Sequence, residues 1–228
     1  MSNAAKTGDA QQQPSTQKRA AVIYRADRVD LMRLKASVHE TLEHLDWAET
    51  IWLPTAAEVP GQSQVQDALR AGATNIVIVG GDGTVRHALQ GLYESPVDID
   101  FVTIGVVPVG TGNVLARNLG IQLGNLPRAV RRALLGDEWR IDLGVAHLTF
   151  DGAQTRTTQV FSVMAGVGLD AKIFANTDRM LKNRYGWVAY IDGGIKSLPT
   201  FFERMNVSVN GGPARTLKLH SLMVGNCG

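Results

Sequence analysis

Two glycine-rich turns, each placed after an aliphatic run, are the parts of this sequence best suited to chemistry. The first is Gly80–Thr84 (GGDGT), which follows NIVIV, and the second is Gly110–Asn113 (GTGN), which follows VVPV. Glycine permits φ > 0 and lets the main chain approach a ligand closely. The N–H groups of such a turn, with a helix N-terminus behind it, favour an anion such as phosphate.

A carboxylate, Asp82, lies inside the first turn. Alone it would repel a phosphate, but it suits phosphates that carry Mg²⁺, held directly or through water. The alternative is a plain turn in which the aspartate bonds its own backbone. Because two such turns follow successive strands, we predict a phosphate site with Mg²⁺ handled by Asp82.

The elements that must position these turns alternate between strands and helices. Strands are expected at 20–25, 50–54, 75–81 and 100–110, and helices at 30–45, 62–71, 84–92 and 126–135. This alternation predicts an α/β fold with a parallel sheet. Since ligands bind beyond the carboxyl ends of such strands, both turns are expected to line one cleft.

After about residue 138 the pattern changes to antiparallel strands, expected at 140–150, 158–168, 205–211 and 214–226, with one helix at 171–183. The run Asn210-Gly211-Gly212 is a hairpin signal. We therefore predict three parts: a disordered tail (1–17), an α/β nucleotide-binding domain (18–137) and an incomplete β-rich domain (138–228).

Composition narrows the class of protein. Of the 228 residues, 44% are hydrophobic and 19% charged, which is typical of a globular protein. A net charge of +2 without a basic block gives no reason to expect a nucleic-acid partner. With Cys227 as the single cysteine and no apolar run of about 20 residues, a cytoplasmic location is expected.

Several further motifs give the sequence a family resemblance. The chain resembles the diacylglycerol kinase catalytic-domain family, which includes sphingosine kinases, and in particular its soluble bacterial members. The motif GGDGT is shared with NAD kinases, whereas PVGTGN is typical of the lipid kinases. The motifs that carry the resemblance are GGDGT (80–84), PVGTGN (108–113), LARNLG (115–120), RIDLG (140–144) and VMAGVGLDA (163–171).

The resemblance implies an NAD kinase/diacylglycerol kinase-like parallel-sheet domain followed by a mostly antiparallel β-sandwich. It implies ATP and Mg²⁺ as cofactors, a lipid substrate met peripherally at a membrane surface, and a possible homodimer. The nucleotide-binding residues it implies are Thr55, Gly80, Gly81, Asp82, Gly83, Thr84, Gly110, Thr111, Gly112 and Asn113. The resemblance implies catalytic roles for two aspartates: Asp82 belongs to the network of water and Mg²⁺, and Asp142 belongs to a network of active-site carboxylates. For Asp142 the alternative is a turn residue at a strand entry.

Some positions depart from the family pattern. Arg25-Ala26 stand where the family has an Asn-Pro turn, Arg86-His87 replace Asn-Glu, and Val114 replaces an aspartate. In bacterial relatives a glutamate taken as the general base lies well beyond a strand end such as Gly225-Asn226. It is expected past Gly228, so the sequence looks like a truncated lipid kinase.

Two other functions compete with a lipid kinase. One is an NAD kinase-like enzyme with a soluble acceptor, and the other is a non-catalytic fragment that binds nucleotide or lipid. The run Gly166–Ala171 also fits G-x-G-x-x-A, a dinucleotide-binding pattern. Because it lies among antiparallel strands, we interpret it as a strand-to-helix turn instead.

Overall fold

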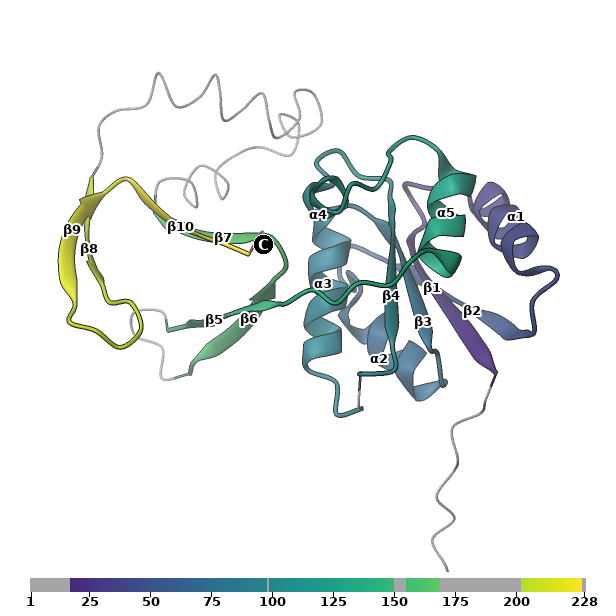
Figure 1. Ribbon diagram of the computed structural model, residues 1–228, viewed down its shortest axis with the longest axis horizontal. Helices are drawn as coiled ribbons and strands as arrows, with labels where there is room; N and C mark the ends of the chain where they lie inside the picture. The colour runs from purple at the N-terminus through teal and green to yellow at the C-terminus, as the bar shows by residue number, and fades with distance from the viewer. Residues whose placement is uncertain (1–16, 98, 150–154, 169–201, 227–228) are drawn as a thin grey trace, which may run out of the picture.

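A parallel four-stranded sheet forms the first part of the molecule, in the order β2-β1-β3-β4 (Figure 1). The computed structural model describes residues 17–97, 99–149, 155–168 and 202–226. The strands are β1 (Lys18–Arg25), β2 (Trp47–Thr55), β3 (Asn75–Gly80) and β4 (Thr103–Pro108). All three neighbouring pairs run parallel. The carboxyl ends therefore lie at one edge, and the predicted α/β class is confirmed.

Helices cover both faces of this sheet. On one face lie α1 (Leu31–Leu42) and α5 (Leu126–Leu135), and on the other lie α2 (Gln62–Arg70), α3 (Asp82–Tyr93) and α4 (Val114–Asn118). The central strand β3 is buried on both sides because Ile76 and Ile78 pack towards α2 and α3, while Val77 and Val79 pack towards α1 and α5. Its continuous aliphatic run is what a strand between two helical layers requires.

Local signals set the helix starts. Asn125 caps α5 by accepting a hydrogen bond from the Arg128 N–H at 3.0 Å, and Pro127 occupies the first turn. The bounds of α5 match the prediction. In contrast, α3 begins at Asp82 rather than Thr84, because the Asp-Gly-Thr of the first glycine turn forms the opening turn of the helix.

The second part consists, among the described residues, of three antiparallel strand pairs. These are β5 (Gly144–Leu148) with β6 (Thr157–Phe161), β7 (Met164–Gly168) with β10 (Ser221–Gly225), and β8 (Glu203–Val207) with β9 (Arg215–Leu219). Asn210 and Gly211 have φ of 52° and 70°, so the loop between β8 and β9 contains the expected turn. The predicted helix 171–183 lies outside the described residues.

Two of the predicted strands each correspond to two strands in the structure. The run 158–168 is not one strand but two, because the chain breaks at Ser162-Val163 and Val163 turns into the core, where it is 9% exposed. The run 214–226 likewise divides into β9 and β10. Gly166 and Gly168 lie in β7, which pairs antiparallel with β10, an arrangement that does not fit a dinucleotide-binding crossover.

The two parts share apolar packing. Val160 of β6 and Val163 belong to the same buried cluster as the inward residues of α2 and α3. In Figure 1, α3 is the helix of the first part that faces β6. Within the described residues, no helix combines the length and apolar character that a membrane crossing requires.

Candidate active site

The two glycine turns touch each other through their backbones at the carboxyl edge of the sheet. The Val109 N–H donates to the Gly80 carbonyl at 3.1 Å. A Cβ on Gly110 would lie 2.5 Å from the Gly81 Cα, and a Cβ on Gly81 would lie 3.1 Å from the Gly110 Cα. Gly110 therefore has no room for a side chain and Gly81 has little, and the two turns, which were predicted to line one cleft, are in direct contact.

The reason for the glycines differs in part from the sequence expectation. None of Gly80, Gly81, Gly83, Gly110 or Gly112 adopts a positive φ. Most of them instead let the main chain of the turn pass close to neighbouring atoms. The exception is Gly83, whose added Cβ would meet nothing within 4 Å. Gly83 lies in the first turn of α3, where the N–H groups of a helix lack intrahelical partners.

Asn113 closes the second turn. Its side chain accepts from the Gly110 N–H at 3.0 Å and donates to the Gly110 carbonyl at 2.7 Å. Asn113 has a left-handed backbone, with φ of 49°, and is buried. Arg117 donates from Nε to the Gly112 carbonyl at 2.8 Å. This bracing leaves Thr111 exposed at the tip of the turn.

Asp82 links the first turn to the helix after the second. Its Oδ1 accepts from the Val114 N–H, the first residue of α4, at 2.6 Å. A Cβ on Gly112 would lie 2.6 Å from the other oxygen, Oδ2, so a side chain there would displace the Asp82 carboxylate. The Asp82 carboxylate thus bonds backbone 32 residues away, a contact that neither alternative considered from sequence included. Oδ2 accepts no hydrogen bond from the described residues.

The side chains of Thr84 and Thr55 are less accessible. Thr84 is buried against the first turn, since a Cβ on Gly80 would lie 2.6 Å from the Thr84 Cβ. Thr55 is buried at the end of β2, and its hydroxyl donates weakly to the Tyr24 carbonyl at 3.4 Å. At both positions the side chain offers little surface for a ligand to contact.

An ion pair closes the turn after β1. Arg25 binds Asp27 in bidentate fashion, with Nε–Oδ1 at 2.8 Å and Nη2–Oδ2 at 2.5 Å. This hydrogen bonding lowers the pKa of Asp27 and raises that of Arg25. The β2 and β3 strands flank β1, so Arg25 lies at the point where the strand order reverses, beside the predicted crevice.

Asp142 lies elsewhere, in the connection between α5 and β5. Its main-chain carbonyl accepts from Nδ2 of Asn226 at 2.7 Å, and the same amide donates to the Ser162 carbonyl at 3.1 Å. The Asn226 N–H donates to the Val163 carbonyl. We name these four residues the Asp142 corner. Within the described part of the chain, no hydrogen bond or ion pair joins the Asp142 carboxylate to Asp82 or to either glycine turn.

His87, on α3, is half-buried rather than fully on the surface. Burial lowers its pKa, and the charge of Arg86 lowers it further. The neutral imidazole contacts the Arg86 guanidinium, with 2.8 Å between Nε2 and Nη2. These contacts give His87 a packing role beside the first turn.

The residues present fit Mg²⁺ only together with a phosphate ligand. The described residues contain no cluster of three or more His, Cys, Asp or Glu side chains that could hold a metal ion. Mg²⁺ is commonly bound by one or two carboxylates, substrate phosphates and waters. The free Oδ2 of Asp82, beside the glycine turns, suits that arrangement.

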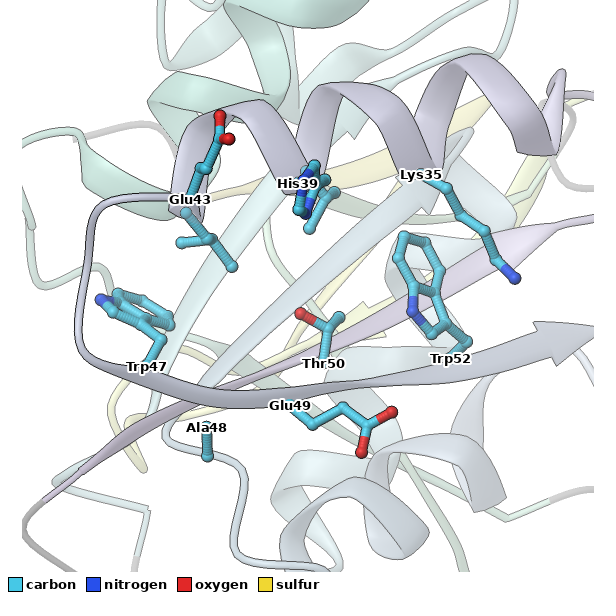
Figure 2. Close-up of a pocket in the computed structure, with 10 residues that line it drawn as sticks. Lys35, His39, Glu43, Trp47, Ala48, Glu49, Thr50 and Trp52 are labelled. Carbon is cyan, nitrogen blue, oxygen red and sulfur yellow. The ribbon is translucent and has the colours of Figure 1, made fainter.

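A groove of about 360 Å³ lies apart from these turns, between α1 and β2 (Figure 2). Trp47 and Trp52 stand at its two ends, with His39 and Thr50 between them. Its β2 residues come from the amino end and middle of the strand. Ligands of open α/β sheets bind at the carboxyl ends, so the glycine turns remain the candidate site.

Comparisons with known proteins agree with this geometry. The family described as the diacylglycerol kinase catalytic domain matches residues 25–146. "Lipid kinase YegS" of Escherichia coli (strain K12) is 31% identical over 136 residues, which are 60% of this chain and 42% of that protein. "Probable lipid kinase YegS" of Shigella flexneri is 30% identical over the same lengths. The chain thus spans less than half the length of these curated relatives.

Solved structures show the same fold. A diacylglycerol kinase from Bacillus anthracis str. Sterne has a TM-score of 0.68 at 21% identity, with coverage of 93% of this chain and 66% of that one. A second structure from that organism has a TM-score of 0.72 at 21% identity and covers 96% and 68% of the two chains.

Proposed function

Because the chain belongs to the diacylglycerol kinase catalytic domain family, we propose that it is a lipid kinase that transfers the γ-phosphate of ATP to the hydroxyl of diacylglycerol. The observation that carries this proposal is the contact between Gly81 and Gly110. This contact brings the two glycine turns, to which we assign phosphate binding, against each other at the edge of a parallel sheet. Phosphoryl transfer depends mainly on positioning and on charge stabilisation, and such turns supply both.

Each part of the turns has a task in this proposal. The N–H groups of the first turn and of the start of α3 hold phosphate oxygens, and exposed Thr111 contacts the nucleotide. Asp82 holds Mg²⁺ through water with its free Oδ2, while Oδ1 keeps α4 in place. When bound, Mg²⁺ offsets the negative charge of the phosphates.

The acceptor hydroxyl must lose a proton during transfer, and a carboxylate is a suitable base. We place Asp142 in the network that receives this proton. Asp142 lies in the connection between α5 and β5, so in this proposal the acceptor approaches from the β region and the nucleotide from the glycine turns. The lipid would be met at a cytoplasmic membrane surface, with the protein bound peripherally.

The test is a transfer assay with radiolabelled ATP and Mg²⁺ against a panel of acceptors. The panel contains diacylglycerol, a sphingoid base and a hydroxyl-bearing phospholipid, each in mixed micelles, and NAD in solution. Labelled phosphatidic acid as the main product supports the proposal. Labelled NADP would favour the NAD kinase-like alternative, and ATP binding without any labelled product would favour a non-catalytic protein.

A further inference from the structure

One line of polar residues runs along α3 from the nucleotide turn to the β region. Asp82, Arg86, Gln90 and Glu94 are spaced by four residues, so they follow one another on the same side of the helix. Asp82 opens the helix at the glycine turns. The next two residues reach β6, which faces α3 in Figure 1.

Gln90 is the buried member of this line. Only 3% of the residue is exposed. Its Oε1 accepts from the Val160 N–H at 2.9 Å, and its Nε2 donates to the Thr158 carbonyl at 3.2 Å. The second Nε2 hydrogen goes to Oε1 of Glu94 at 2.6 Å. The carboxamide therefore bonds β6 on the side opposite β5, much as a neighbouring strand would.

The contacts around Gln90 fix its side chain in turn. Glu94 also accepts a hydrogen bond from Nε2 of Gln62, on α2. One turn of α3 earlier, Arg86 donates from Nη1 to Oε1 of Gln159 at 3.0 Å. Helix α3 thus holds three consecutive residues of β6, two through main-chain atoms and one through its side chain.

From β6 the path to Asp142 is short. Ser162 and Val163 follow Val160 by two and three positions, and Asn226 binds the carbonyls of both. The same Asn226 amide binds the Asp142 carbonyl at 2.7 Å. Any shift of β6 away from α3 therefore moves the Asp142 corner.

We propose that Gln90 is a positioning residue, which sets the place of the Asp142 corner relative to the nucleotide turns. A single rigid helix connects the two: Asp82 and Gln90 are eight residues apart, about 12 Å along the axis. This inference rests on the proposed function, because it assigns the glycine turns and Asp142 to one reaction. An apolar side chain at position 90 would fill the space but leave the Thr158 carbonyl and the Val160 N–H without partners.

The first test replaces the carboxamide with an apolar chain of similar length, Gln90→Met. The matched control is Gln64→Met, since Gln64 is also buried on the same face of the sheet but bonds the carbonyls of Pro54 and Val59. Hydrogen exchange is measured on the whole chain without ligand. In Gln90→Met we expect exchange at Val160 and Asn226 to accelerate at least tenfold, with β3 amides changed less than twofold. Gln64→Met should leave Val160 and Asn226 protected.

The second test is kinetic and uses the transfer assay. In Gln90→Met we expect kcat for the lipid acceptor to fall at least tenfold, while the Kd for ATP changes less than twofold. If the unmodified chain phosphorylates no acceptor, the proposed function fails. The hydrogen-exchange measurement still decides whether Gln90 fixes the position of the Asp142 corner.

A third variant, Gln90→Glu, keeps the shape of the side chain. Its protonated carboxyl can donate to Thr158 and accept from Val160, but its ionised form can only accept. Burial and the neighbouring Glu94 carboxylate raise the pKa of such a group, and the Arg86 charge one turn away opposes this. We therefore expect the Tm deficit of Gln90→Glu, relative to the unmodified chain, to shrink as the pH falls from 8 to 5. Unchanged exchange at Val160 and Asn226 in Gln90→Met would overturn the proposal, as would an unchanged kcat in an active enzyme.

Discussion

The two carboxylate oxygens of Asp82 have different roles in the proposed site. Oδ1 accepts from the first N–H of α4, and Oδ2 is free to face a metal ion in the proposed site. The two tasks can be separated by substitution, because an amide oxygen can replace the first acceptor but cannot supply the charge.

Asp82→Asn should fold with a loss of roughly 0.5 kcal/mol, the cost of removing a charge from the start of α3. Asp82→Ala should lose roughly 1–2 kcal/mol, because the cap of α4 is removed as well. Both variants should reduce Mg²⁺-dependent turnover by about 100-fold or more. Urea denaturation and the transfer assay measure the two effects, and full activity in Asp82→Asn would disprove the metal role.

His87 should make stability depend on pH. Its pKa lies below the ordinary value because burial disfavours the imidazolium. Below about pH 6.5 the unfolded chain therefore binds more protons at this residue than the folded chain, so the stability contributed by His87 falls as the pH drops. We expect the urea midpoint to fall more between pH 7.5 and pH 5.5 in the unmodified chain than in His87→Gln. Equal losses in the two proteins would contradict this assignment.

Sequence reasoning predicted that the two glycine turns lie at the same edge of the sheet, but not which groups they bond. The partner of Asp82 lies 32 residues away, and that of Asp142 lies 84 residues away. No local pattern reveals such pairs. Gln90 was overlooked because α3 contains several polar residues and glutamine is mostly exposed in proteins, so nothing in its residue type indicated burial. The four-residue spacing from Asp82 to Glu94 was the available signal.

At the scale of elements, α3 contains two glycines with opposite surroundings. A Cβ on Gly91 would lie 2.4 Å from the Gln62 carbonyl oxygen at the start of α2, whereas a Cβ on Gly83 would meet nothing within 4 Å. Gly91→Ala should therefore destabilise the fold by about 1–3 kcal/mol through overpacking. Gly83→Ala should be neutral or stabilise by up to about 1 kcal/mol through helix propensity. Denaturant titration measures the free energy of unfolding of the two variants. Equal values would show that α2 shifts away from α3 without a loss of stability.

The contact between the turns can be tested in the same way. In Gly110→Ala the new Cβ would collide with the Gly81 backbone, so we expect the turns to separate and ATP binding to weaken at least tenfold. Gly105→Ala is the matched control within β4, since its Cβ would lie 2.4 Å from the Ala133 carbonyl oxygen, away from the turns. Calorimetric titration with Mg·ATP should show binding retained in Gly105→Ala. Retained binding in Gly110→Ala would contradict a phosphate role for these turns.

Element bounds were predictable where the sequence contains its own stop signals. Pro127 in the first turn and Gly136 after the last residue indicated the bounds of α5, and the aliphatic run of β3 indicated a strand buried on both faces. The break between β6 and β7 was not predictable, because it depends on Val163 packing against helices that are distant in sequence. Apolar alternation alone continues through that position.

At the scale of the molecule, the core of the sheet extends into the β region through Val160, which is 2% exposed. We expect Val160→Ala to lower the stability of both parts together by about 1–3 kcal/mol. Hydrogen exchange should show similar losses of protection for the amides of β3 and of β6. Val209→Ala, at a site that is 71% exposed, should change stability by less than about 0.5 kcal/mol. A loss confined to β6 would mean that the sheet is stable without it.

The bond from Asn226 to Asp142 spans 84 positions, and this span has a consequence for biosynthesis. A ribosome adds about 5–20 residues per second, so Asn226 is made roughly 4–17 seconds after Asp142. By then all four strands of the parallel sheet, and both glycine turns, have already left the peptidyl-transferase centre. The nascent chain can thus assemble the parallel sheet and its glycine turns before the hydrogen bond from Asn226 to Asp142 can form. In refolding followed by pulsed hydrogen exchange, the amides of β3 should become protected before those of β10.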